Sequence, residues 1–172
     1  RVRRAISLAV DREEFMKVVS GGKGQWSFGG SVAGSFPEAE VKKVLRHDVA
    51  EAKRLLAQAG YANGVDLEWP FVKGDADLTS YELIQAQLKK AGINVVLKPL
   101  GKPEQRELRK SGNFDLDIGI AGGQLNADPD SGVFASYYSR SKGNYGFYKD
   151  AELDRLLLGQ RQEIDPEKRK QL

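Results

Sequence analysis

The feature that most constrains the fold is an alternation of strand and helix patterns between residues 65 and 120. Apolar side chains recur at every second position in three short stretches, at residues 65–71, 93–97 and 114–120. Helical patterns separate these stretches, and each is long enough for a crossover between parallel strands. Because such crossovers are right-handed, the order predicts an α/β fold: a mixed sheet with a parallel βαβαβ core, flanked by helices. Pro70 removes one ladder donor, so the first strand should end there or lie at an edge.

The helix boundaries are marked by local signals. A Ser, Thr, Asp or Asn followed three residues later by Glu is a capping box, which satisfies free N–H groups at a helix start. Glycine after an apolar stripe is typical of a helix end. Further helices are expected to begin near Asp130 and Asp150. The boxes are Asp11 with Glu14, Asp48 with Glu51 and Thr79 with Glu82, and the terminating glycines are Gly60, Gly92 and Gly112.

Composition bounds the class of protein. At 172 residues, with 40% hydrophobic and 30% charged residues, the chain fits one ordinary globular domain. A net charge of +3 does not call for nucleic acid or a membrane surface as partner. There is no cysteine, which excludes disulfides and thiolate chemistry, and no apolar run reaches membrane-spanning length. The chain begins inside a helical pattern and stops soon after another begins at Asp165, so we expect a fragment truncated at both ends.

Few residues suggest catalysis. His47 is the single histidine and lies just before a helix cap, which favours a solvated or capping role over a catalytic one. Asp115 and Asp117 share one strand face, and an exposed polar face explains them better than acid–base chemistry. Neither the calcium-like spacing at residues 126–130 nor the glycines at residues 21–24 complete a metal or phosphate motif. We therefore expect no enzyme, no metal and no cofactor, although an α/β enzyme of unknown reaction stays the alternative.

The loop after Ile120 is the predicted ligand-binding edge. In open α/β sheets, ligands lie at the carboxyl ends of the strands. Glycines there let the backbone approach a ligand, and short polar side chains can hydrogen-bond to it. Two aromatic residues in an earlier glycine-rich loop either cover the core edge or contact the ligand. The candidate binding residues are Trp26, Phe28, Gly122, Gly123, Gln124, Asn126 and Asp128.

Several ordered stretches resemble one known family, the extracellular solute-binding proteins of family 5, the peptide/nickel type. Residues 2–12 (VRRAISLAVDR) resemble its "VRxAIxxAIDR" helix, residues 51–61 (EAKRLLAQAGY) its "AKxLLAEAGY" helix, and residues 87–95 (QLKKAGINV) its helix–strand junction. The match continues in order through Phe114-Asp115, Asp128-Pro129-Asp130, Asn144-Tyr145 and residues 153–157. Each piece is short, but the ordered set covers nearly the whole chain.

The resemblance implies a soluble receptor of an ABC importer. Such receptors have the type II periplasmic binding protein fold, with two lobes that close on a ligand, and residues 1–172 would form most of the second, C-terminal lobe. The resemblance also implies an extracytoplasmic location, either periplasmic or lipid-anchored, a monomeric state and a membrane permease as partner. A receptor used for sensing rather than import is a further alternative.

One departure from the family pattern concerns the ligand. Peptide receptors of this type often carry an acidic residue shortly before the Asp-Pro-Asp, where it holds the peptide's amino group. Here Gln124, Leu125 and Asn126 occupy that stretch, and a glycine replaces the Trp often found before it. The missing acidic residue makes a peptide with a free α-amine a less secure ligand, and a neutral solute held by amide hydrogen bonds and Trp26 is an alternative. Asp128 is the remaining candidate for the acidic role.

Overall fold

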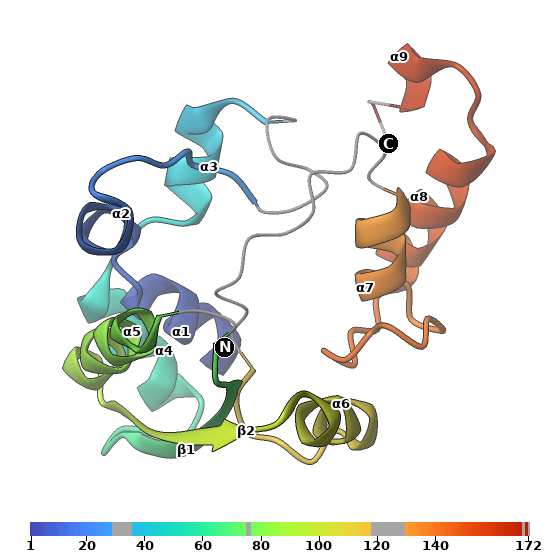
Figure 1. Ribbon diagram of the computed structural model, residues 1–172. Helices are drawn as coiled ribbons and strands as arrows, with labels where there is room; N and C mark the ends of the chain where they lie inside the picture. Colours follow the sequence, from blue (N-terminus) through green and yellow to red (C-terminus); the bar gives the residue numbers. More distant parts are fainter. Residues whose placement is uncertain (29–35, 75–76, 118–129, 170, 172) are drawn as a thin grey trace. The chain divides into compact units, whose positions relative to one another are not determined.

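The computed structural model describes residues 1–28, 36–74, 77–117, 130–169 and 171 (Figure 1). The chain divides into two compact units. The first unit comprises Arg1–Trp26 and Pro37–Ala121, and the second comprises Ser27–Phe36 and Gly122–Leu172. Each unit is described by itself below.

A two-stranded parallel sheet is the base of the first unit. Strands β1 (Val65–Val72) and β2 (Ile93–Leu100) pair in register from Val65 opposite Ile93 to Val72 opposite Leu100. Helix α5 (Leu78–Lys90) forms the crossover between them. The predicted parallel arrangement of these two strands is confirmed, and with it the class of helices on a parallel sheet.

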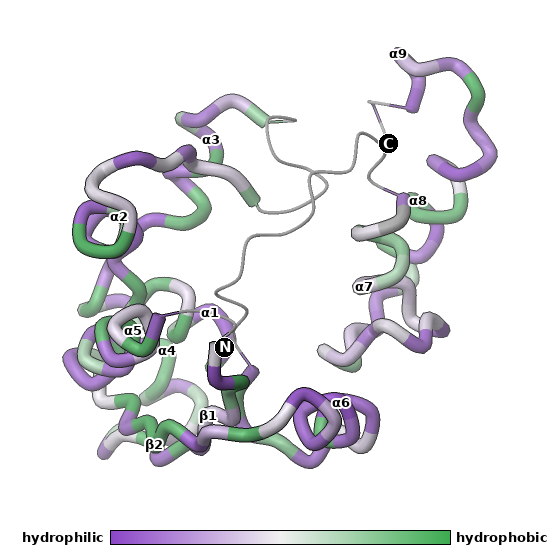
Figure 2. Tube along the Cα trace, viewed as in Figure 1, coloured by the Kyte–Doolittle hydropathy of each residue, from purple (hydrophilic) through white to green (hydrophobic). Residues whose placement is uncertain are grey.

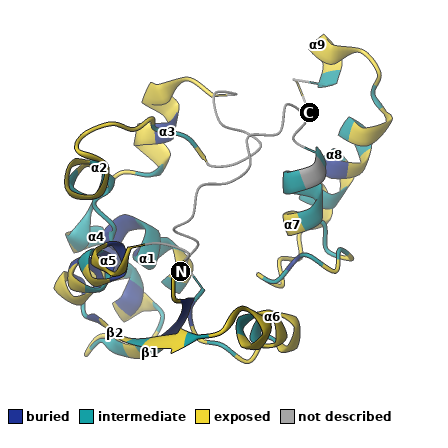
Figure 3. Ribbon diagram, in the orientation of Figure 1, coloured by how far each residue is buried: buried dark blue, intermediate teal, exposed yellow. Residues whose placement is uncertain are grey.

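One face of this sheet carries the core. Helices α1 (Val2–Ala9), α4 (Val49–Gln58) and α5 lie over it, as Figure 1 shows. Side chains that alternate on β1 and β2 meet the apolar stripes of these helices. Figure 2 shows hydrophobic residues on these elements, and Figure 3 shows that buried residues lie there too. The buried cluster consists of Ala5, Leu8, Ala9, Ala52, Leu56, Trp69, Phe71, Tyr81, Ile84, Leu88, Ala91, Ile93, Val95 and Leu116.

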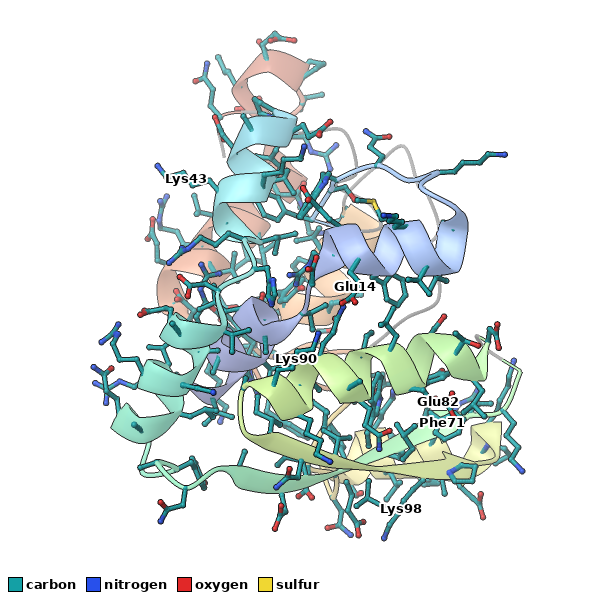
Figure 4. The ribbon with its side chains drawn as sticks, turned by 90° about the vertical axis from the view of Figure 1, so that its left-hand side faces the viewer. Glu14, Lys43, Phe71, Glu82, Lys90 and Lys98 are labelled. Atoms are coloured by element: carbon teal, nitrogen blue, oxygen red, sulfur yellow. The ribbon has the colours of Figure 1, made fainter. Side chains whose placement is uncertain are left out.

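The opposite face of the sheet is mainly polar, although it also carries the exposed side chain of Val96. Figure 4 shows Phe71 on the side of α5 and Lys98 on the other side. On that outer side Asn94 Nδ2 donates to Asp66 Oδ1 across the strands (2.8 Å), and Lys98 pairs with Glu68. Parallel sheets are usually covered on both faces. Here the cross-strand polar pairs keep the outer side compatible with water.

Both edges of the sheet are blocked by side chains. Val65 N–H faces β2, so the N–H of Glu68, three residues on, faces the other edge, where Asp115 Oδ2 accepts from it (2.9 Å). Pro70 has no N–H to offer there. At the outer edge of β2, Gln85 Nε2 donates to the Val95 carbonyl oxygen (2.6 Å). Residues 114–117 of the predicted third strand are therefore not in a strand, and residues 118–120 lie outside the described residues.

Most of the predicted helix caps are confirmed. Asp48 Oδ1 accepts from the Glu51 N–H, and Asp150 Oδ1 accepts from the first N–H groups of α8 (Ala151–Gln162). The predicted cap at Thr79 is wrong. Asp77 caps α5 instead and accepts from the Thr79 N–H at 3.3 Å, because an aspartate two residues earlier reaches the same free donors.

Three further helices surround this unit. Helix α2 (Arg12–Ser20) follows α1 after a sharp corner, and α3 (Glu38–Val44) begins at the end of the stretch, residues 23–40, that the sequence predicted as a glycine-rich loop. Helix α6 (Lys102–Ser111) contacts β1 and ends at Gly112, whose φ of 71° is left-handed. In chain order, α2 precedes Trp26, and α6 leads from β2 towards the segment before residue 118.

The second unit is helical in its described part. A π-helical turn (Asp130–Phe134) leads into α7 (Ala135–Tyr137), and α8 and α9 (Pro166–Arg169) follow. Asn144 is 8% exposed and organises the turn before α8: its Nδ2 donates to the carbonyl oxygen of Tyr148 (2.7 Å), and its Oδ1 accepts from the Tyr148 N–H (2.9 Å). The predicted helix at Asp130 thus begins as a π-turn.

Candidate functional site

Most of the predicted ligand loop lies outside the described residues. This applies to Gly122, Gly123, Gln124, Asn126 and Asp128. Their assignment to a ligand site therefore stays a prediction. The structure does describe both flanks of this loop and the two aromatic candidates, Trp26 and Phe28.

Trp26 belongs to the first unit and is half-buried. The ammonium nitrogen of Lys42, on α3, lies 5.7 Å from the centroid of its ring. A cation at this distance over an indole makes a favourable contact. The Trp26 ring therefore has a cationic partner within the protein. This contact does not decide whether the ring also contacts a ligand.

Phe28 belongs to the second unit and is 37% exposed. Its ring meets that of Phe36 edge to face, with 5.0 Å between the centroids, and Phe36 is 46% exposed. This geometry is one of the preferred ones for aromatic pairs. This contact joins Phe28 and Phe36 directly, although they are eight positions apart in the sequence.

The first flank of the predicted ligand loop is held by three successive side chains. Asp115 accepts from the backbone of β1, as described above, and Leu116 is 6% exposed within the core. Asp117 receives two hydrogen bonds from Arg109 of α6: Nε to Oδ2 (2.5 Å) and Nη2 to Oδ1 (2.9 Å). The two aspartates therefore do more than form an exposed polar face. They fix the chain immediately before residue 118.

The second flank is also held through an aspartate. Asp130 Oδ1 accepts from Gln160 Nε2 (2.8 Å) and lies 3.1 Å from Arg161 Nε, both on α8. The Arg161 guanidinium also lies 4.1 Å from the centroid of the Phe134 ring. Charge-assisted contacts of this kind are stronger than neutral hydrogen bonds. Side-chain contacts therefore hold an aspartate on each side of residues 118–129, namely Asp117 and Asp130.

A polar corner between α1 and α2 supports the first unit from the side opposite the sheet. Arg12 Nη1 donates to the carbonyl oxygens of Ser7 (2.9 Å) and Leu45 (3.0 Å). Burial lowers the pKa of the Arg12 guanidinium, and the charge of Arg4 lowers it further, but arginine remains charged at neutral pH. His47 Nδ1 lies 3.4 Å from Asp11 Oδ2 in the same corner, so its observed partner is a helix cap.

Gln87 ties this corner to α5. It is 1% exposed, accepts from the Asp11 N–H (3.1 Å) and donates to the Asp11 carbonyl oxygen (3.1 Å) and to Glu14 Oε2 (2.7 Å). Glu14 and Lys90, which lie 4.0 Å apart, approach each other beside it (Figure 4). Sequence reasoning missed this role, because Gln87 occupies an ordinary position in a helical pattern and its partners are distant in sequence.

The described residues contain neither a metal-binding cluster nor a membrane-spanning helix. Within the described ranges, no three His, Cys, Asp or Glu side chains are placed to hold a metal ion together. No helix in this part of the chain has both the length and the apolar character needed to cross a bilayer.

The arrangement of helices on a parallel sheet is similar to that in solved periplasmic binding proteins. Residues 1–144 match the family described as bacterial extracellular solute-binding proteins, family 5 Middle. The chain belongs to this family, as the sequence resemblance predicted.

Individual relatives support this assignment. The chain is 25% identical to the oligopeptide-binding protein AppA of Bacillus subtilis (91% of this chain, 32% of that protein) and 28% identical to the dipeptide-binding protein of Pseudomonas aeruginosa (99% and 33%). Among solved structures, the periplasmic binding protein AgaA of A. tumefaciens R10 in complex with agropinic acid superimposes with a TM-score of 0.80 at 26% identity (99% and 36%). The chain spans about a third of the length of these relatives.

Proposed function

We propose that the protein containing this chain is the extracytoplasmic solute-binding component of an ABC importer. It captures a peptide or a related small solute between two lobes and delivers it to a membrane permease, without catalysing a reaction. The observation that carries this proposal is the family match over residues 1–144, because the relatives' names describe proteins that bind solutes. Residues 1–172 would contribute the greater part of the second lobe, in a receptor that acts as a monomer in the periplasm or at the cell surface.

The ligand class rests on both the relatives and this chain's own residues. Two relatives are named as oligopeptide- and dipeptide-binding proteins, which favours a peptide. AgaA was solved with agropinic acid, so the same fold also accommodates a different small molecule. Gln124 and Asn126 stand in the stretch where an acidic residue would pair with a peptide's amino group. We therefore extend the proposal to solutes without a free α-amine. Mass spectrometry of small molecules released from the natively purified full-length protein tests this directly.

The proposed binding site consists of the loop with Gly122, Gly123, Gln124, Asn126 and Asp128, together with the two aromatic residues Trp26 and Phe28. Closing lobes exclude water, so each amide hydrogen bond and each aromatic contact contributes more to the binding free energy. A single lobe leaves these groups in water. The isolated chain of residues 1–172 should therefore bind far more weakly than the full-length receptor.

Replacing Asn126 or Trp26 by alanine in the full-length protein should weaken binding of the released solute by roughly 1–3 kcal/mol, which is the cost of losing a buried hydrogen bond or an aromatic contact. Isothermal titration calorimetry measures the effect. Asn113→Ala and Tyr61→Ala are matched controls, since both side chains are exposed and lie outside the proposed site. Unchanged affinity in both site variants would move the binding site to other loops.

A further inference from the structure

The α7–α8 turn, residues 137–149, carries the whole net charge of the chain. It contains three cations, Arg140, Lys142 and Lys149, and neither aspartate nor glutamate. The chain has 27 Lys and Arg and 24 Asp and Glu, so the 24 cations outside the turn balance all of the acidic residues. The net charge of +3 is therefore concentrated in one short segment, which favours a partner of opposite charge.

The same turn is rich in exposed aromatic residues. Four of the chain's six tyrosines lie in it, together with one phenylalanine. Tyr137 is 49% exposed, Phe147 54% and Tyr148 39%, and Figure 3 shows that much of the turn is exposed. The rings of Tyr137 and Tyr148 meet edge to face with 6.1 Å between their centroids, which brings the two ends of the turn together. Cations and aromatic rings are thus gathered in one compact turn.

The path of the turn is fixed by hydrogen bonds. Ser141 Oγ donates to the carbonyl oxygen of Ala135 (2.6 Å), and Asp154 Oδ1 of α8 accepts from the Ser139 N–H (2.8 Å). Phe147 has a φ of 51°, a left-handed conformation that bulky residues rarely adopt. Strained backbone of this kind persists where the surroundings impose it, and it is frequent at functional sites. The turn therefore has a defined shape.

The three cations are available to a partner. Arg140, Lys142 and Lys149 are exposed, and none of them forms an ion pair with any described residue. Cations on the following helix are engaged within the protein: Arg155, for example, pairs with Glu152 at 2.6 Å. Because the cations of the turn have no such partner among the described residues, their charge can act on an external anionic group.

The size of the turn distinguishes between two kinds of anionic partner. A stable protein–protein interface takes about 800 Å² and roughly 20–30 residues from each side. Residues 137–149 are fewer than that, and Asn144 among them is buried. A bilayer surface sets no such minimum, because each Lys or Arg gains separately from anionic headgroups, and Tyr is enriched at the membrane–water interface. The turn therefore fits a lipid surface better than a protein surface.

We propose that the α7–α8 turn is a contact site for an anionic lipid bilayer. Arg140, Lys142 and Lys149 meet the headgroups, and Phe147 with its neighbouring tyrosines reaches the interface. This contact goes beyond the proposed function and holds whichever solute the receptor carries. Each cation near an anionic surface is worth about fivefold in affinity, so three should favour an anionic over a neutral bilayer by roughly a hundredfold. Binding of this strength is reversible.

Vesicle co-sedimentation tests the contact on the full-length, ligand-free protein, produced without any acyl chain. Vesicles of phosphatidylcholine alone are compared with vesicles of an equimolar mixture of phosphatidylcholine and phosphatidylglycerol, at low ionic strength. The protein should bind the anionic vesicles about tenfold to a hundredfold more tightly. Added salt should release it, because salt shortens the range of the attraction. Equal binding to both vesicles, or binding to neither, would overturn the proposal.

Two triple variants that change the net charge equally show where the charge acts. One removes the cations of the turn, and the other removes three exposed cations of α3, α4 and α5 that pair with no described residue. The first should lose the preference for anionic vesicles by about tenfold to a hundredfold, and the second should keep it. Equal losses would mean that overall charge drives binding, which contradicts the proposal. The variants are Arg140→Gln/Lys142→Gln/Lys149→Gln and Lys43→Gln/Lys53→Gln/Lys89→Gln.

Phe147→Asn tests the aromatic contribution. Asparagine tolerates a left-handed backbone, so the turn should keep its shape while the ring is lost. Binding to anionic vesicles should weaken by about threefold to tenfold, since less apolar surface enters the interface. Tyr61→Asn, which removes an exposed aromatic side chain outside the turn, should bind like the wild type. If the two variants bind equally, the aromatic part of the proposal is wrong.

An acidic protein surface is the other partner that this charge would suit. To test it, the permease of the proposed importer is reconstituted in phosphatidylcholine vesicles. Binding to these vesicles alone, abolished by the triple variant of the turn, would assign the turn to a protein partner and overturn the lipid contact. Solute binding is measured separately by calorimetry, so failure of the lipid contact and failure of the proposed function remain distinguishable.

Discussion

Gly64→Ala is expected to destabilise the protein by roughly 2–5 kcal/mol, because it combines a strained backbone with a clash. Gly64 precedes β1 and has a φ of 95°, which L side chains rarely adopt. An added Cβ would lie 2.6 Å from the carbonyl oxygen of Gly92. That oxygen accepts from the Val65 N–H (3.0 Å) in the first hydrogen bond of the parallel ladder. The substitution therefore acts on the point where the two strands begin to pair.

Gly60→Ala separates the cost of the strained backbone from the cost of the clash. Gly60 has a nearly equal φ of 92°, but an added Cβ there would meet nothing within 4 Å. It should cost only the backbone strain, about 1–2 kcal/mol. Urea unfolding of the full-length, ligand-free protein, followed for both variants, measures the difference. If the two glycines prove equally sensitive, the close approach between Gly64 and Gly92 does not limit stability.

Gln87→Leu is expected to cost roughly 2–4 kcal/mol, because a buried donor and a carboxylate lose their partner. Leucine fills a similar volume, so the loss reports the hydrogen bonds rather than a cavity. The Asp11 N–H would lose its acceptor, whereas the Asp11 carbonyl oxygen keeps the Phe15 N–H as donor. Among the described residues, the Glu14 carboxylate would retain the contact with Lys90, at 4.0 Å. Thermal unfolding should show a lower midpoint, and hydrogen–deuterium exchange should show faster exchange of the α2 backbone amides.

Gln85→Leu is the matched control for this substitution. Gln85 lies two residues earlier on α5 and makes one hydrogen bond, to the Val95 carbonyl oxygen at the edge of β2. Its loss should cost about 1 kcal/mol, the usual net value of a single hydrogen bond. Similar losses for the two glutamines would indicate that the corner at Asp11 contributes no more to stability than an edge contact.

The candidate site shows what a single sequence can and cannot indicate. A loop of glycines and short polar residues after a strand pattern indicated a ligand edge, because that composition follows from local requirements of backbone approach and hydrogen bonding. The partners of Asp115 and Asp117 were not predictable in the same way. Both were interpreted as an exposed polar face, whereas the structure gives them contacts with β1 and with Arg109.

The sequence by itself determined the elements whose causes are local. Aspartate caps at residues 11, 48 and 150 and the glycine at residue 112 depend on side chains within a few positions of the helix end. The two strands followed from alternation, and their parallel pairing followed from the length of the helix between them. The ordered family motifs depend on the sequence alone and were sufficient to predict the family.

Only the tertiary structure decided how distant polar groups are paired. Gln87 meets Asp11 across 76 positions and Asp115 meets Glu68 across 47, and no periodicity predicts such a meeting. The cap of α5 at Asp77 is a local contact instead, and the prediction at Thr79 missed it because Asp77 reaches the same free donors from two residues earlier. At the free edge of β1, Asp115 accepts from the Glu68 N–H and Pro70 has no N–H, so neither position offers a donor to a third strand. Local patterns specify the elements, whereas long-range packing selects among the partners that each polar group could have.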